Sequence, residues 1–286
     1  MKLVRIAMVA IIILSVAVLG FAKNSWDEKV GQHAQKPQQL KEVSESAEVS
    51  PAIQEKETSE TSEFYDLLIG KEVSKVKLIG DGITAGFGHS AYSSPDEGRI
   101  VFSNSGQTFR EPGFEFDSWA NQLRQYVSAP EFGEVDVVNA GIIDKTADWT
   151  LRNIDSLLAE QEDAVFVMLG TDDRIYSSIE KFESDMRQLL AIADERSEYL
   201  VVMSPPPSKE EIYPYKFTMA QVDAVLRTVS EEQGYIFLSH YDAIQQHLAD
   251  NKSIVYEDMM QTAGANPVDE GYAVMWETIR AELGLQ

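Results

Sequence analysis

Carboxylate side chains stand directly after several short apolar runs of the sequence. The residues concerned are Asp81, Asp144, Asp172 and Asp173. Hard cations such as calcium and magnesium prefer carboxylate oxygens, and converging loops can supply several of them. A calcium or magnesium site is therefore one hypothesis, although the spacing matches no dedicated metal-binding loop. A structural or solvent-exposed role for the same carboxylates is the alternative.

Histidine is the other residue type in this chain that transfers protons near neutral pH. The chain has four histidines, and His240 directly follows a strand-like apolar run. Paired with the hydroxyl of Thr84 or Ser204, it is a candidate for a relocated catalytic dyad. The alternative is a lone histidine that caps or fills a strand–helix junction. The chain has no cysteine, which excludes disulfide bonds and cysteine-ligated metals.

Apolar strand-like runs alternate with helical patterns from residue 63 onward. Strands are predicted at residues 76–79, 135–139, 164–169, 199–203 and 235–238, and helices at residues 117–127, 147–160, 177–193, 218–233, 241–249 and 269–283. This alternation is typical of a parallel sheet with helices on both faces. We predict a three-layer α/β/α, doubly wound, flavodoxin-like fold with five parallel strands. Ligands of such folds bind at the C-terminal ends of the strands.

A long loop is predicted at residues 91–115, where glycine, serine and proline are mixed with aromatic residues. Long loops at strand ends often carry function. Phe102, Phe109, Phe114 and Phe116 lie in or next to this loop and are candidate ligand contacts, with packing of the loop itself as the alternative.

The turn Gly80-Asp81-Gly82 is the first of an ordered set of motifs. The others are Asn139-Ala140-Gly141, Gly170-Thr171-Asp172-Asp173, Ser204-Pro205-Pro206-Pro207 and Pro267-Val268-Asp269-Glu270-Gly271-Tyr272. In this order they resemble the conserved blocks of the SGNH (GDSL-type) hydrolases, over essentially all of residues 76–283. The resemblance implies the SGNH hydrolase fold. It also implies acyl transfer, in which a serine attacks an ester carbonyl with help from histidine and aspartate.

The resemblance further implies where the family's catalytic groups would lie. The position of the nucleophilic serine is Gly82, and the position of the oxyanion-binding asparagine is Asp172. The aspartate and histidine of the last block correspond to Ala263 and Asn266, whereas the oxyanion-binding glycine is kept as Gly141. Gly82 has no hydroxyl, and a charged Asp172 repels an oxyanion. We therefore expect ordinary ester hydrolysis to be lost.

The composition divides the chain into three segments. In residues 1–22, Lys2 and Arg5 precede an uncharged apolar run, which predicts either a cleaved signal peptide or an uncleaved membrane anchor. Both place the protein on the extracellular side of the cell membrane, secreted or anchored. Residues 23–62 are rich in polar residues and predict a disordered tether. Residues 63–286 are predicted to form the SGNH-hydrolase-like domain that the resemblance implies.

The formal net charge of the chain is −23 at pH 7. Such a surface repels polyanions, so nucleic acid is not expected as a partner. The leading hypothesis is an exported, catalytically impaired SGNH-like protein that binds an acylated glycan or cell-wall polymer, or serves as a scaffold. An active esterase or lipase with relocated catalytic groups and a purely structural exported protein are the alternatives.

Overall fold

The computed structural model describes residues 63–94, 98–104, 106–209, 211, 214–261 and 264–285. The predicted signal or anchor segment and the predicted tether lie outside the described residues, and so does Ala263. Within the described part of the chain, no helix is long and apolar enough to cross a bilayer.

Five parallel strands form the central sheet in the order β4-β1-β5-β6-β7. Their bounds are β1 (Lys75–Gly80), β4 (Asp136–Gly141), β5 (Glu162–Met168), β6 (Ser197–Ser204) and β7 (Ile236–Ser239). The chain passes from β1 to β4 on one side and then returns to β5 on the other side of β1. This order confirms the predicted flavodoxin-like fold and places the topological switch point at the C-terminal ends of β1 and β5.

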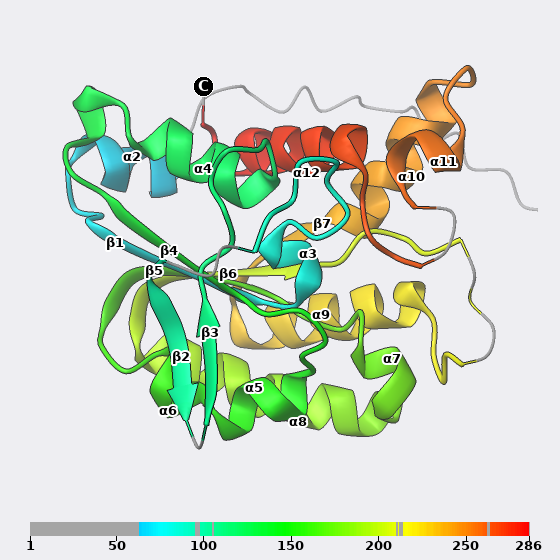
Figure 1. Cartoon of the computed structure of the whole chain (residues 1–286), viewed down its shortest axis with the longest axis horizontal. Coiled ribbons are helices and arrows are strands. Elements are labelled where there is room, and N and C mark those ends of the chain that lie inside the picture. Colours follow the sequence, from blue (N-terminus) through cyan, green and yellow to red (C-terminus); the bar gives the residue numbers. More distant parts are fainter. Residues whose placement is uncertain are drawn as a thin grey trace, which may run out of the picture. The chain divides into compact units, whose positions relative to one another are not determined.

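Helices cover both faces of this sheet, as Figure 1 shows. One face carries α2 (Glu63–Ile69), α4 (Trp119–Val127) and α12 (Asp269–Glu282). The other carries α5 (Ala147–Arg152), α6 (Ile154–Leu157), α8 (Ile179–Glu195) and α9 (Met219–Gln233). The remaining helices are α3 (Gly82–Ala85), η1 (Pro130–Phe132), α7 (Asp173–Tyr176), α10 (His240–Asp250) and α11 (Tyr256–Met259). Each face has its own apolar core, which confirms the three-layer prediction.

The sequence explains these elements locally. Side chains from Ala164 to Met168 in the central strand β5 are fully buried, as a continuous apolar run predicts for a parallel strand covered on both faces. Helix α9 begins with a capping box in which Thr218 and Gln221 bond each other's backbone. The single helix predicted at residues 147–160 is wrong. Asn153 has a non-helical backbone and donates its side-chain amide to the Trp149 carbonyl at 2.7 Å, which separates α5 from α6.

The long loop predicted at residues 91–115 is also corrected. It contains an antiparallel hairpin of β2 (Ile100–Asn104) and β3 (Gln107–Arg110). The hairpin packs on α5 through its aromatic side chains, because the ring centroids of Phe102 and Trp149 lie 5.0 Å apart. The inserted segment is therefore a structured hairpin beside the edge strand β4 and helix α6.

Candidate functional site

The turn after β1 places Asp81 and Gly82 at the C-terminal edge of the sheet. Asp81 caps α3, and its Oδ1 accepts a hydrogen bond from the Ile83 N–H at 2.9 Å. An aspartate with an extended backbone is a preferred residue at this position. The Asp81 side chain is 1% exposed, and hydrogen bonds from the hydroxyl and the N–H of Thr171 help to stabilise its charged form. The carboxylate is therefore a structural group of the turn.

Two side chains from distant parts of the chain hold this turn in place. The Asn139 amide on β4 donates to the Thr84 carbonyl at 2.9 Å. The Tyr272 hydroxyl on α12 donates to the carbonyls of Ile83 at 3.1 Å and Phe87 at 2.9 Å. The geometry of the turn is therefore fixed by β4 and α12 and needs no catalytic side chain.

A cavity of about 110 Å³ opens beside this turn. Its polar lining consists of Asp81, Asp144, Thr171, Asp172 and Asn266. Its apolar and aromatic lining includes Phe87, Ile143, Ile175 and Tyr215. We call it the acidic cavity. It brings Gly82, Asp172 and Asn266 together, as the sequence resemblance implies for the nucleophile, oxyanion and histidine positions.

The carboxylates of the acidic cavity repel one another. Burial raises the pKa of Asp81 to about 6. Burial also raises the pKa of Asp172 to about 7, and the charges of Asp81 and Asp144 add to this effect, while Arg174 and Lys145 oppose it. Near neutral pH, Asp172 is therefore partly protonated, and in that form it can donate a hydrogen bond. The expected repulsion of an oxyanion applies to the charged form of Asp172 only.

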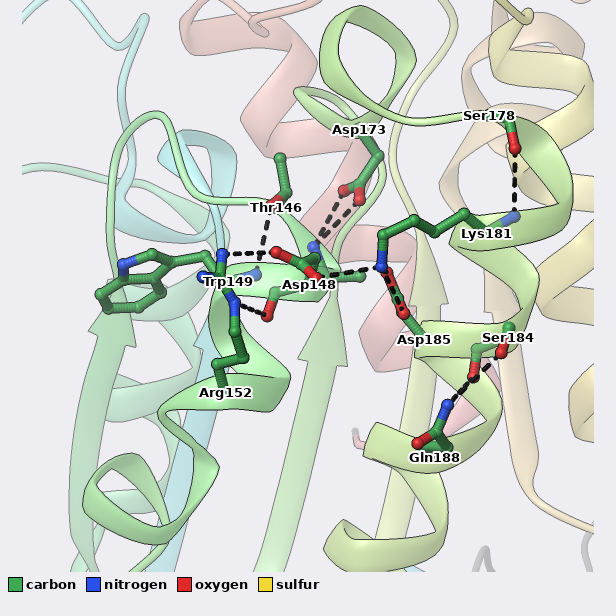
Figure 2. A network of polar contacts seen from close by, with 11 residues as sticks. Thr146, Asp148, Trp149, Arg152, Asp173, Ser178, Lys181, Ser184, Asp185 and Gln188 are labelled. Atoms are coloured by element: carbon green, nitrogen blue, oxygen red, sulfur yellow. Dashed lines mark hydrogen bonds and ion pairs between the residues drawn. The ribbon is translucent and has the colours of Figure 1, made fainter.

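Asp173 does not line this cavity, although it is the next residue after Asp172. Both of its side-chain oxygens accept the Ala147 N–H, at 3.0 and 3.1 Å, at the start of α5 (Figure 2). It is fully buried, and burial raises its pKa to about 7 despite this hydrogen bond. Beside it, Lys181 on α8 donates to Asp148 on α5 at 3.0 Å. Asp173 thus belongs to the contacts that hold α5.

Of the four carboxylates that we expected to converge, only Asp81, Asp144 and Asp172 line the acidic cavity. Among the described residues, no group of three or more histidine, cysteine, aspartate or glutamate side chains could hold a metal ion. The geometry gives no support to the calcium or magnesium hypothesis.

The two glycines assigned to the catalytic site differ in their surroundings. A Cβ atom added to Gly82 would lie 3.5 Å from the Cβ of Phe87 and 3.6 Å from Cγ1 of Ile143, which is ordinary contact. At Gly141 it would lie 2.4 Å from the backbone nitrogen of Ala85, which is an overlap. The fold therefore requires a glycine at residue 141 but accepts a side chain at residue 82.

The Gly141 N–H is already used. It donates to Oδ1 of Asn139 at 2.9 Å, so it is not free to bind an oxyanion in this structure. Asp144, three residues later, has a left-handed backbone with φ of 59° and lines the acidic cavity. This loop therefore presents a carboxylate to the cavity, and the expected donor role of Gly141 is not available.

The relocated dyad around His240 is not formed. His240 is fully buried, and neither ring nitrogen has a hydrogen-bond partner among the described residues. Burial lowers its pKa to about 3, so the ring is neutral. The Ser204 hydroxyl instead donates to Asp223 at 2.6 Å, and the Thr84 hydroxyl has no partner within the described part of the chain. His240 is a packed side chain at a strand–helix junction.

A second hollow of about 610 Å³ lies beside the hairpin. We call it the hairpin groove. Its lining includes Tyr92, Phe109 and Arg110 near or on the hairpin, Gly141 at the end of β4, and Ile143 just after it. Ile143 also lines the acidic cavity, so the two hollows share a wall. The two hollows are therefore neighbours on either side of this side chain.

The four phenylalanines expected as ligand contacts have different surroundings. Phe109 lines the hairpin groove. Phe102 and Phe116 are 3% and 5% exposed and pack in the interior. Phe114 is exposed, with the guanidinium of Arg124 stacked 4.0 Å from its ring centroid. Packing of the loop is thus the main role of this aromatic group.

Residues 78–274 match the GDSL-like lipase/acylhydrolase family. The chain belongs to this family. The match spans the β1 turn, the acidic cavity and most of the sheet. No curated protein matches the sequence.

Solved structures share the GDSL-like fold of this chain. Axe2, an acetylxylan esterase from Geobacillus stearothermophilus, is 21% identical with a TM-score of 0.58, over 76% of this chain and 97% of the esterase. Variants of Axe2 with alanine for a serine, an aspartate or a histidine are described as catalytic mutants. LAE5, an alpha/beta hydrolase from the metagenome of Lake Arreo, Spain, is 17% identical with a TM-score of 0.55, over 74% of this chain and 95% of LAE5. At these identities the likeness shows the fold alone.

Sequence reasoning missed several residues of the site. Thr171 was visible inside a motif, but its place in the cavity depends on the turn after β5. Phe87 lies just after the first motif but was not expected to contact a ligand, and Tyr215 lines the cavity from a loop with no recognisable pattern. Only the three-dimensional arrangement of these loops identifies them.

Proposed function

We propose that this chain is an exported, non-hydrolytic member of the GDSL-like family that uses the retained cleft to bind a ligand. The observation that carries the proposal is Gly82, which lines the acidic cavity at the position of the nucleophilic serine and has no side-chain oxygen. Covalent acyl transfer needs a nucleophile and an adjacent base. Asn266, an amide, stands at the histidine position, and no described histidine lines the cavity.

The ligand class that we favour is an acylated glycan of the cell envelope. The hairpin groove supports this choice, because its volume of about 610 Å³ suits an extended ligand and it contains the rings of Tyr92 and Phe109. Axe2, with the same fold, is an acetylxylan esterase. Lys2, Arg5 and the apolar run that follows support export, with the protein anchored to the membrane or secreted.

The first test measures hydrolysis and binding with the full chain. We expect only background hydrolysis of p-nitrophenyl acetate and no labelling by a fluorophosphonate probe. Acetylated xylo-oligosaccharides should raise the melting temperature more than the same oligosaccharides after deacetylation, because a ligand that binds only the folded state stabilises it. Stoichiometric labelling of a serine or threonine, or clear ester hydrolysis, would refute the proposal.

The second test restores the missing groups. The fourfold variant Gly82→Ser, Asp172→Asn, Ala263→Asp and Asn266→His should fold and hydrolyse a small acetyl ester. Single restorations should stay near background, because these groups act as a unit. The matched control is the same set with Gly82→Ala, which fills the same space without a hydroxyl. A folded fourfold variant no more active than this control would show that the cleft is not preserved.

A further inference from the structure

The hairpin groove differs in charge from the chain as a whole. The formal net charge of the chain is −23, yet no described acidic side chain lines this groove, whereas the guanidinium of Arg110 does. The acidic cavity on the other side of Ile143 is lined by three carboxyl groups. The two neighbouring hollows therefore differ in the sign of the charge that they present to a ligand.

The Arg110 side chain is exposed at the end of β3 and has donors to spare. Its Nη1 donates a hydrogen bond to the Gly98 carbonyl at 2.6 Å, which holds one end of the guanidinium beside the groove. The adjacent Glu111 is buried and pairs with Arg124 at 2.6 Å, so it does not neutralise Arg110. No other described carboxylate forms an ion pair with Arg110. A guanidinium has five N–H donors, so several remain for a ligand.

Lys145 places a second positive charge next to the same groove. Its ammonium lies 5.2 Å from the ring centroid of Phe109, which lines the groove, and 5.3 Å from that of Trp149. Aromatic rings attract a cation but do not neutralise its charge. Most lysines and arginines of the described residues are paired with acidic side chains, whereas Lys145 forms no such pair there. Lys145 therefore adds a positive potential to the groove without being part of its lining.

The aromatic rings of the groove are held in place by their neighbours. The ring centroids of Tyr92 and Phe116 lie 5.9 Å apart, and those of Phe109 and Phe102 lie 5.8 Å apart. Tyr92 and Phe109 both line the groove. Fixed aromatic surfaces beside a few polar groups suit a sugar ring, which has apolar C–H faces and polar edges.

The charges favour a carboxylate over a polymer of phosphates. A planar carboxylate can accept two N–H groups of one guanidinium, which adds both strength and direction to the contact. A chain with a phosphate on every unit is repelled by a protein of net charge −23. A sugar with one carboxylate needs only the local positive charge of Arg110 and Lys145.

We propose that the hairpin groove binds a sugar residue that carries a carboxylate, so that the ligand of this protein is an acidic glycan. This inference rests on the proposed function, because it names a chemical group of the glycan that the cleft binds. Arg110 donates hydrogen bonds to the carboxylate, Lys145 supplies the second positive charge, and the groove's aromatic rings contact the sugar ring. The carboxyl groups of the acidic cavity repel the same carboxylate, so the acidic sugar lies on the hairpin side of Ile143.

The experiment measures dissociation constants by isothermal titration calorimetry, with the full chain at pH 7 and constant ionic strength. The probe is xylotetraose with one glucuronic acid branch. Its matched counterpart is the same oligosaccharide after reduction of the carboxylate to an alcohol. The acidic form should bind about tenfold more tightly, which is the usual effect of a charge-assisted hydrogen bond.

Three results of this titration would overturn the proposal. They are equal affinities of the acidic and reduced forms, no measurable binding of the acidic form, and binding that is as tight or tighter when a phosphate replaces the carboxylate. The last result would show that the groove selects phosphate.

Variants locate the effect. Arg110→Gln should reduce the tenfold preference to about twofold, and Arg110→Lys, which keeps the charge but not the planar fork, should retain more of it. Lys145→Gln should reduce the preference by about two- to threefold, because it removes a charge that does not contact the ligand. Affinity for the reduced oligosaccharide should stay as in the parent, which verifies that each variant is folded.

The matched control is Lys252→Gln, which removes a positive charge from an exposed residue outside the groove. It should keep the full preference for the acidic form. An unchanged preference in the double variant Arg110→Gln and Lys145→Gln, or an equal loss in the control, would overturn the proposal.

The two proposals fail separately. Stabilisation by acetylated xylo-oligosaccharides without any preference for the acidic form would refute the carboxylate site and leave the ligand-binding function standing. Ester hydrolysis by the unmodified chain would refute the non-hydrolytic function, whatever the preference for the acidic form.

Discussion

Replacing Asp172 by asparagine should stabilise the protein at pH 8, and by clearly less at pH 5. In the folded protein the pKa of Asp172 is raised from 3.8 to about 7, by burial and by the charges of Asp81 and Asp144. The folded state therefore holds a proton that the unfolded state releases. Between pH 4 and pH 7, stability falls as the pH rises, by up to about 1.4 kcal/mol per pH unit for one such group. Asparagine is neutral throughout and removes this dependence.

The expected magnitude is smaller than the full shift implies. Without screening, that shift corresponds to about 4 kcal/mol at pH 8. Asp172 is partly exposed, and Arg174 and Lys145 offset some of the repulsion, so we expect a gain of about 1–2 kcal/mol. For a domain of this size, that gain raises the melting temperature by about 3–6 °C.

The assay is thermal unfolding followed by circular dichroism at pH 5, 6, 7 and 8, at constant ionic strength. The parent, Asp172→Asn and the exposed control Asp117→Asn are compared at each pH. The difference between Asp172→Asn and the parent should grow with pH, and the control should follow the parent. A difference that is the same at pH 5 and pH 8 would show that Asp172 is not protonated in the folded state.

Two further predictions concern residues whose surroundings are clear. His240→Leu should raise the free energy of unfolding by about 1–3 kcal/mol in urea titrations at pH 7, because it removes two buried nitrogens without partners. The pKa of His240 is lowered to about 3 in the folded protein, so below pH 6.5 the unfolded parent takes up a proton that the folded parent does not, and the parent loses stability as the pH falls. The variant has no such proton uptake and should lose less stability between pH 7 and pH 5. A variant less stable than the parent at both pH 7 and pH 5 would contradict this reasoning. Gly141→Ala should cost more than about 2 kcal/mol, whereas Gly82→Ala should cost less than about 1 kcal/mol, because only the first overlaps the backbone. Equal losses would refute the steric difference.

Much of the fold could be predicted from the sequence because its strands are buried on both faces. The continuous apolar run at residues 164–168 is typical of a strand that is covered on both faces, and its side chains are fully buried. The hairpin β2–β3 was missed because its short strands are largely exposed and mixed with turn residues, so no alternating pattern is visible. The break at Asn153 depends on a side-chain hydrogen bond that no helix pattern shows.

The sequence allowed us to predict which residues lie near one another at the candidate site, but not where their side chains point. Gly82, Asp172 and Asn266 do meet at one cavity, because the order of the strands brings their loops together. Asp172 and Asp173 separate because neighbouring residues at a helix start point in directions about 100° apart. Asp173 therefore reaches the N–H of Ala147 while Asp172 reaches the cavity. Such a division follows from the register of α7, which adjacent letters in a sequence do not reveal.

The free space at residue 82 makes this chain a convenient carrier for chemical probes. The sequence contains no cysteine, so Gly82→Cys would give the protein a single thiol at the floor of the cavity. The rate at which a small alkylating reagent modifies that thiol would report whether the cavity is free or occupied, without any other residue being altered. The surrounding carboxylates would raise the pKa of that thiol, so the reaction calls for mildly alkaline buffer. Ligands with no chromophore and no turnover would then become measurable by the protection that they give to the thiol.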